Sequence, residues 1–308
     1  MVLHVALVSQ TPLIPLGQLM TVAAALQKQV LRDFGPLWDI SATVDAFERV
    51  EEVPIDYWPI VVKAEIDTAN EGYHRLGDTG QPFSVVRASA DWTINASHEC
   101  LEMLADPWGH RIVAGESPEE GQGRVAFLVE VCDACQHPRY SYRVNDVAVS
   151  DFCTPSYFDP VQAPSGRYSF SGELMGPHEV LPDGYLAWIH PETKELWQLR
   201  RPEGATLIES VGRMPPELAS MREHSDRCSA ELRAAVFSRP MGREPSGPIR
   251  ATSPEGEGAD RALSTLSASQ RSARLAAASA GVREAIDALA ERRSGTSDKA
   301  NAHQRKRR

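Results

Sequence analysis

Long hydrophobic runs are missing from this sequence of 308 residues, and cysteine is scarce. No stretch reaches the roughly 18 consecutive apolar residues that a transmembrane helix needs, so we expect no membrane partner. The five cysteines are an odd number and too few for a disulfide scaffold, which favours a reducing compartment. Residues 1–8 have no basic leader and are typical of a first strand rather than a secretory signal. The sequence therefore predicts a cytoplasmic protein.

Motifs for nucleotide and serine chemistry are missing as well. The chain contains neither of the glycine-rich loops that cradle phosphate groups, nor the Gly-x-Ser-x-Gly turn of serine hydrolases. Positive charge is scarce in residues 1–200, which hold 13 Lys and Arg against 28 Asp and Glu. Residues 201–308 reverse the balance, with 19 against 14. Because nucleic-acid-binding domains usually present a cationic face, we expect no nucleic acid at the core.

All six Trp and all seven Tyr lie within residues 1–200, and we predict the folded domain there. Residues 201–258 are predicted to be a mostly disordered linker, because their Pro-, Gly- and Ser-rich part has little to bury. Apolar residues at helical spacing predict an amphipathic helix over 259–293. Residues 294–308 end in a basic tip, for which a disordered, solvated tail is the simpler interpretation and binding of a partner the alternative.

Apolar periodicity within residues 1–200 predicts an α+β fold, in which a twisted sheet packs on two main helices and a β-rich second half follows. The helices are expected at 17–34 and 92–105. Asp106-Pro107 ends the second one, because proline disfavours helix in the residue before it. Strands are expected at 2–9, 41–48, 58–66, 81–88 and 124–131, with short strands or hairpins at 140–150, 168–175 and 185–199.

The second predicted helix contains the sequence His98-Glu99-x-x-Glu102. Residues four apart lie about 40° from each other around a helix, so His98 and Glu102 can reach one metal ion from the same face. Glu99 lies about a quarter turn away, where its carboxylate can activate water without binding the metal. The zinc helix His-Glu-x-x-His has this arrangement, and a carboxylate is an acceptable second ligand. We predict a Zn²⁺ site held by His98 and Glu102, with Glu99 as the catalytic base.

A third metal ligand must come from elsewhere in the chain. Glu130 follows an apolar, strand-like run, so we expect it to emerge from the core at the end of that strand. A carboxylate in that position has few alternatives to pairing with a cationic side chain or binding a metal ion. Asp133 follows three residues later and is the rival. We favour Glu130, and keep Asp133 as the alternative ligand or as a hydrogen-bonding partner of His98.

The segment Ser-His-Glu-x-x-Glu-x-x-x-Asp-Pro that begins at Ser97, followed by Glu-Val-Cys-Asp-x-Cys from Glu130, resembles a set of zincin-like sequences. The plant EXORDIUM-like proteins and a group of bacterial proteins show this pattern. The resemblance covers roughly residues 1–200. It implies a zincin-type fold and a metallopeptidase-like site that acts on a peptide or protein substrate.

Two functions are therefore in competition. The first is a zinc hydrolase of peptidase type, and the second is a non-catalytic structural or interaction protein on a zincin-derived scaffold. His74 lies just ahead of the motif helix, either as a donor to the transition state or as an exposed turn residue. Cys132 and Cys135 form a lone Cys-x-x-Cys, which is more typical of buried thiols than of a redox pair or a zinc knuckle.

Overall fold

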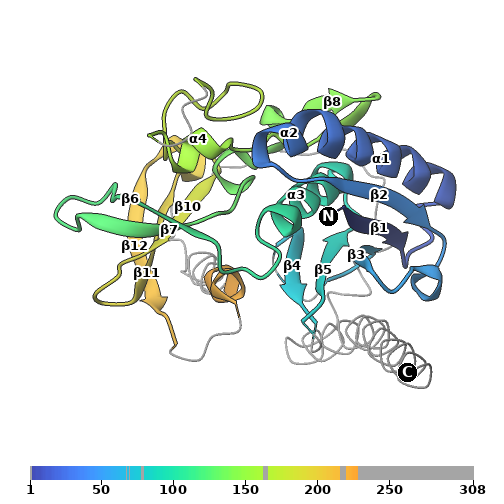
Figure 1. Ribbon diagram of the computed structural model, residues 1–308, viewed down its shortest axis with the longest axis horizontal. Coiled ribbons are helices and arrows are strands. Elements are labelled where there is room, and N and C mark those ends of the chain that lie inside the picture. Colours follow the sequence, from blue (N-terminus) through green and yellow to red (C-terminus); the bar gives the residue numbers. More distant parts are fainter. Residues whose placement is uncertain are drawn as a thin grey trace, which may run out of the picture.

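The computed structural model describes residues 2–66, 68, 70–77, 80–161, 166–215 and 220–227. These residues form two five-stranded sheets and a small hairpin. In Figure 1 the first sheet lies on the right and the second on the left, with α3 (Trp92–Ala105) between them. The expected α+β class is confirmed. The helix expected at 259–293 and the tail at 294–308 lie outside the described residues.

The first sheet has the strand order β2-β1-β3-β5-β4. Neighbouring strands run parallel except at one edge, where β4 is antiparallel to β5. Because β4 pairs only with β5, its outer side is an edge of the sheet. The strands span Leu3–Ser9 (β1), Ala42–Phe47 (β2), Tyr57–Lys63 (β3), Gly72–Leu76 (β4) and Pro82–Arg87 (β5).

Two helices cover one face of the first sheet. The first, α1, spans Leu16–Lys28 and continues as a π-helix over Gln29–Phe34 and as α2 over Gly35–Trp38. Its apolar side chains pack in one core with side chains of α3 and with the inward-facing side chains of β1 and β3. Ala6 and Val8 of β1 point to the opposite face, because successive strand residues alternate. This packing holds α3 rigidly across the sheet, against β4 and β5.

The second half is β-rich, as expected, and its sheet has the order β12-β11-β10-β7-β6 with antiparallel pairing throughout. Its strands span Ile112–Glu116 (β6), Arg124–Leu128 (β7), Tyr185–Ile189 (β10), Glu195–Arg200 (β11) and Leu207–Arg213 (β12). The hairpin of β8 (Tyr142–Val144) and β9 (Val147–Val149) lies against α3 and α1. The short helices are Val50–Glu52, Asp133–Cys135, Pro138–Tyr140, α4 (Pro155–Phe158) and Pro202–Gly204.

The ordered fold continues beyond residue 200, where the domain was expected to end. β12 pairs with β11 along its length, and residues 221–227 are helical. Met221 packs against Leu128 and Leu196 on the second sheet. The predicted linker is therefore wrong over its described part. A strand that extends an existing sheet gains backbone hydrogen bonds while burying few side chains, so its composition can resemble that of a linker.

The other secondary-structure predictions differ in quality. The helix at 92–105 is confirmed at both ends. The strand predicted at 168–175 is wrong, since that segment contributes a single bridge between Cys153 and Ser169. Gly172 interrupts it with φ of 85°, a conformation that no strand residue adopts. The strands β6 and β12 were not predicted.

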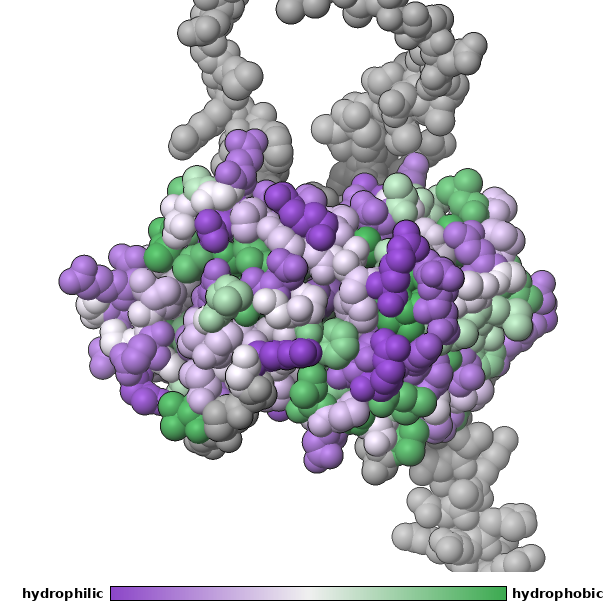
Figure 2. Space-filling model, turned by 90° about the horizontal axis from the view of Figure 1, so that it is seen from above, coloured by the Kyte–Doolittle hydropathy of each residue, from purple (hydrophilic) through white to green (hydrophobic). Residues whose placement is uncertain are grey.

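The surface of the described residues is mixed in character. In Figure 2, hydrophobic patches are small and lie among hydrophilic residues on the face seen from above. None of the described helices combines the length and the hydrophobicity that crossing a membrane requires.

Candidate functional site

Helix α3 carries the three motif residues to the junction of the two halves. Its buried residues include Glu99 and Glu102, which would be unfavourable without partners. The helix ends where the Asp106 amide donates to the Glu102 carbonyl, and the Asp106 carboxylate then accepts from the amides of His110 and Arg111. These bonds fix the end of the helix, and with it the position of Glu102.

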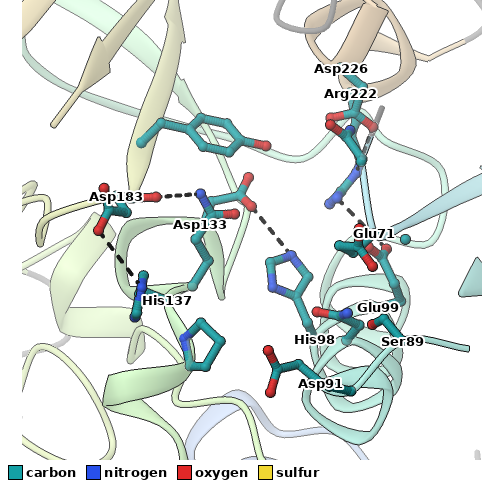
Figure 3. Close-up of a pocket in the computed structure, with 17 residues that line it drawn as sticks. Glu71, Ser89, Asp91, His98, Glu99, Asp133, His137, Asp183, Arg222 and Asp226 are labelled. Atoms are coloured by element: carbon teal, nitrogen blue, oxygen red, sulfur yellow. Dashed lines mark hydrogen bonds and ion pairs between the residues drawn. The ribbon is translucent and has the colours of Figure 1, made fainter. Parts of the chain in front are cut away.

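His98 lies between two carboxylates. Its Nε2 atom is 3.2 Å from Glu102 Oε2 and 3.3 Å from Asp133 Oδ1. Figure 3 shows His98 with Asp133 on one side and Glu99 on the other. The predicted ligands His98 and Glu102 are thus brought together, and the alternative third ligand, Asp133, meets them.

The loop after β7 supplies the remaining carboxylates. Glu130 and Asp133 are 7% and 2% exposed, and both lie in a segment anchored through its backbone. The Cys132 amide donates to Glu102 Oε1 over 3.1 Å, and the Cys153 amide donates to the Val131 carbonyl over 2.6 Å. Glu130 does follow an apolar strand, β7, and its carboxylate pairs with Arg222. One set of ligand atoms within 4.8 Å of one another comprises Glu102, Glu130 and Asp133.

Arg222 is the functional-site residue that the sequence did not reveal. Its side chain is 4% exposed, and its Nη1 atom contacts Glu102 Oε2 and Glu130 Oε2. Its Nη2 atom lies 3.8 Å from Glu99 Oε2, and its Nε atom lies 3.5 Å from Asp226 Oδ2. Arg222 is 120 residues from Glu102 along the chain, in a region expected to be disordered, so no local pattern pointed to it.

Burial and neighbouring charges shift the protonation of this cluster. Burial lowers the pKa of His98, but Glu102 and Asp133 outweigh it and hold that pKa well above its ordinary value. Burial raises the pKa of Glu102, yet Arg222 and His98 reverse the sign and bring it below its ordinary value. Burial raises the pKa of Glu130 well above its ordinary value, and Arg222 offsets this only in part. Glu102 is therefore ionised between two cations.

Glu99 lies beside His74, and ligand atoms of His74, Glu99 and Glu102 all lie within 4.8 Å of one another. His74 belongs to β4, is 2% exposed, and places Nδ1 3.4 Å from Glu99 Oε2. Burial lowers the pKa of His74 to about 3, so its ring is neutral and the contact is no ion pair. Burial also raises the pKa of Glu99 to about 7, against the opposing charges of Arg222 and His98. His74 is thus neither an exposed turn residue nor part of the cavity wall described next.

A cavity of about 530 Å³ opens over the cluster. His98, Glu99, Asp133, Arg222 and Asp226 line it, as do Asn70, Glu71 and Gly72 at the start of β4. Figure 3 shows Arg222 and Asp226 reaching it from the helix at residues 221–227. A ligand in this cavity would contact the motif helix, the sheet edge and the loop after β7 at once.

The cysteine pair has no separate site of its own. The four described cysteines, Cys100, Cys132, Cys135 and Cys153, are buried free thiols. Burial raises the pKa of Cys132 well above its ordinary value, which keeps the thiol protonated and poorly nucleophilic. The backbone of Cys132 supports Glu102, as described above, and its Sγ atom also lies within 4.8 Å of ligand atoms of both His98 and Glu102.

No protein-family model matches this chain, and no curated protein matches it. The resemblance to zincin-like sequences therefore stays a prediction, carried by the motif residues.

Proposed function

We propose that this protein is a zinc-dependent hydrolase of metallopeptidase type. The observation that carries the proposal is the pair of separations at His98 Nε2, of 3.2 Å to Glu102 Oε2 and 3.3 Å to Asp133 Oδ1. Ligands at about 2.0–2.1 Å from a tetrahedral zinc ion lie about 3.3–3.4 Å apart. Both separations from His98 Nε2 thus match the ligand–ligand distance of a tetrahedral zinc site.

Unpaired carboxylate oxygens at the site support the same assignment. Glu99 Oε2, Glu130 Oε1 and Asp133 Oδ2 are buried and have no hydrogen-bond partner among the described residues. A buried polar atom without a partner is costly, and a divalent cation would satisfy several of these oxygens together. Oxygen and imidazole donors are ligands that zinc accepts.

The arrangement of the first sheet supports a zincin-like fold. Its antiparallel edge strand, β4, begins at the cavity wall, while the motif helix crosses the sheet beside it. An extended peptide can add to such a sheet edge through backbone hydrogen bonds, with its scissile bond held over the motif helix. The substrate class that fits is therefore a peptide or an exposed protein segment.

The roles of the side chains follow from their positions. Zinc at this site would supply Lewis acidity for attack on a carbonyl group. His98, Glu102 and either Asp133 or Glu130 would hold it. Glu99 lines the cavity next to His98 and has a buried oxygen that makes no hydrogen bond among the described residues, so it can accept a proton from water and return it to the leaving amine.

Metal content of the full-length protein tests this proposal. We expect about one zinc per chain by mass spectrometry after reconstitution, and loss of the metal in His98→Ala and in Glu102→Ala. Glu99→Gln should keep the metal and abolish cleavage of a peptide library. Failure of both the folded wild-type protein and a folded Arg222→Met variant to bind zinc would rule out the hydrolase.

The contacts of Arg222 favour a second candidate, the non-catalytic scaffold. In it the guanidinium pairs permanently with the side chains of Glu102 and Glu130, and the cluster is a buried polar network that joins the two halves. The same metal measurement separates the two candidates, because a permanent ion-pair network binds no zinc in the wild-type protein.

A further inference from the structure

The helix at residues 221–227 presents a cation to the atoms that a metal ion would bind. Glu102 Oε2 is the oxygen that faces His98 Nε2, and the same oxygen contacts Arg222 Nη1. One carboxylate oxygen cannot serve a zinc ion and a guanidinium equally well, because the two cations repel each other at this distance. Zinc and the observed position of Arg222 therefore compete for Glu102.

Specific contacts hold this helix in place from its first residue. The amides of Met221 and Arg222 donate to the carbonyl of Gly109 over 2.9 and 3.3 Å. On the second sheet, Gln198 Nε2 donates to Ser225 Oγ over 3.1 Å. The helix thus docks through its backbone and through a side chain away from the carboxylate cluster.

The docked helix also closes part of the cavity. Arg222 and Asp226 both line the cavity wall, at 4% and 6% exposure. Arg222 is held from two directions, by Glu130 at its tip and by Asp226 at its Nε atom. Both carboxylates pair with the guanidinium of Arg222. Neither is needed as a zinc ligand if His98, Glu102 and Asp133 hold the metal.

We propose that residues 220–227 form an internal plug, in which Arg222 occupies the carboxylate of Glu102 and must withdraw before zinc binds there. This inference rests on the proposed zinc site, and concerns its regulation. The plugged state is folded and metal-free, with the charge of its carboxylates partly neutralised by the chain itself. Metal loading then requires that the plug open, so the helix controls when the site becomes competent.

Zinc affinity of full-length variants tests the plug. Arg222→Met keeps a long, buried side chain but removes the charge, so we expect zinc to bind at least about tenfold more tightly. Arg222→Lys keeps the charge, and its affinity should stay within about threefold of wild type. Arg227→Met is the matched control, because Arg227 is 59% exposed and pairs only with Glu223 among the described residues. The dissociation constants are measured by competition with a chromogenic zinc chelator.

The outcomes separate the plug from the zinc site. Zinc bound equally well by wild type and Arg222→Met would overturn the plug and leave the zinc site standing. Folded wild type and variants that all fail to bind zinc would overturn the zinc site, and the plug with it.

Hydrogen exchange on the wild-type protein tests whether the plug opens on zinc binding, even if Arg222→Met does not fold. The amides of Met221 and Arg222 are protected by their bonds to Gly109, and zinc addition should speed their exchange by about tenfold or more. Exchange that stays the same or slows on zinc addition would overturn the plug, because it would show that the helix remains docked beside the metal.

Discussion

Gly109 leaves no room for a side chain beside Ser220. A Cβ atom at Gly109 would lie 2.1 Å from Ser220 Oγ, and the Gly109 backbone has φ of 65°. The same glycine accepts the first two amide bonds of the helix at residues 221–227. The loop after α3 therefore contacts the start of that helix so closely that only glycine fits at position 109.

Gly109→Ala should displace the helix without touching the carboxylate cluster. We expect zinc affinity to rise by about five- to tenfold, since a plug weakened by about 1–1.4 kcal/mol shifts the competition by that factor. The matched control is Gly121→Ala, because Gly121 also has positive φ, of 86°, but has nothing within 4 Å of its Cβ position. Equal zinc affinities in the two variants, measured by chelator competition, would contradict the role of Gly109 in holding the helix in place.

The third metal ligand can be identified from two conservative substitutions. Asp133→Asn should weaken zinc binding by about 10- to 100-fold, because Asp133 Oδ1 is spaced from His98 as a ligand should be. Glu130→Gln should change the affinity less, because Glu130 holds Arg222 and its loss also loosens the plug. The reverse ranking in a zinc titration would restore Glu130 as the ligand that the sequence favoured.

His74 is expected to position Glu99. Replacing His74 by Ala removes the ring that lies 3.4 Å from Glu99 Oε2, so we expect kcat for peptide cleavage to fall by about 10- to 100-fold with KM little changed. Zinc content should stay at one per chain, which a general loss of folding would not allow. The control is His110→Ala, at an exposed position. A rise in KM with kcat unchanged would point instead to substrate contact.

Zinc removal should leave the protein folded. Arg222 supplies positive charge to Glu102 and Glu130 in the absence of metal, whereas a purely structural zinc site unfolds on chelation. Circular dichroism with and without EDTA should therefore show the same secondary structure at 25 °C, and a melting temperature lower by only a few degrees. Loss of secondary structure on chelation would contradict this expectation.

Gln29 is a buried polar contact that should matter for stability alone. Its side chain is 0% exposed, donates to the Ser150 carbonyl over 2.9 Å, and accepts from Ser97 Oγ over 2.8 Å. Gln29→Ala removes both buried hydrogen bonds, so we expect about 1–3 kcal/mol less free energy of unfolding in urea titrations. Thr21→Ala, on the exposed face of α1, should cost far less.

The sequence predicts the α3 part of the site well because the chemistry there is local. One helical repeat places His98 and Glu102 on one face, and Asp106-Pro107 marks the end of the helix. The position of Glu130 is also foreseeable, because an apolar strand precedes it. These features depend on residues close together in sequence, where periodicity and turn chemistry carry the information.

The rest depends on contacts between distant segments, which no local pattern records. β12 has no fully buried side chain and forms because β11 offers it backbone partners. Arg222 lies among residues of ordinary polar composition, and only the docked fold brings it to Glu102. His74 likewise faces Glu99 only once β4 has paired with β5.

The acidic lining of the cavity has a consequence for the speed of binding. Glu71, Asp91 and Asp183, from the strongly acidic residues 1–200, line its walls together with Asp226. A concave surface of one sign focuses the electric field outward and concentrates counter-ions at its mouth. Cations and the cationic ends of peptides would be drawn in from beyond contact range, while anionic ones would be turned away. Raising the ionic strength would therefore lower the association rate of cationic ligands more than it raises their dissociation rate.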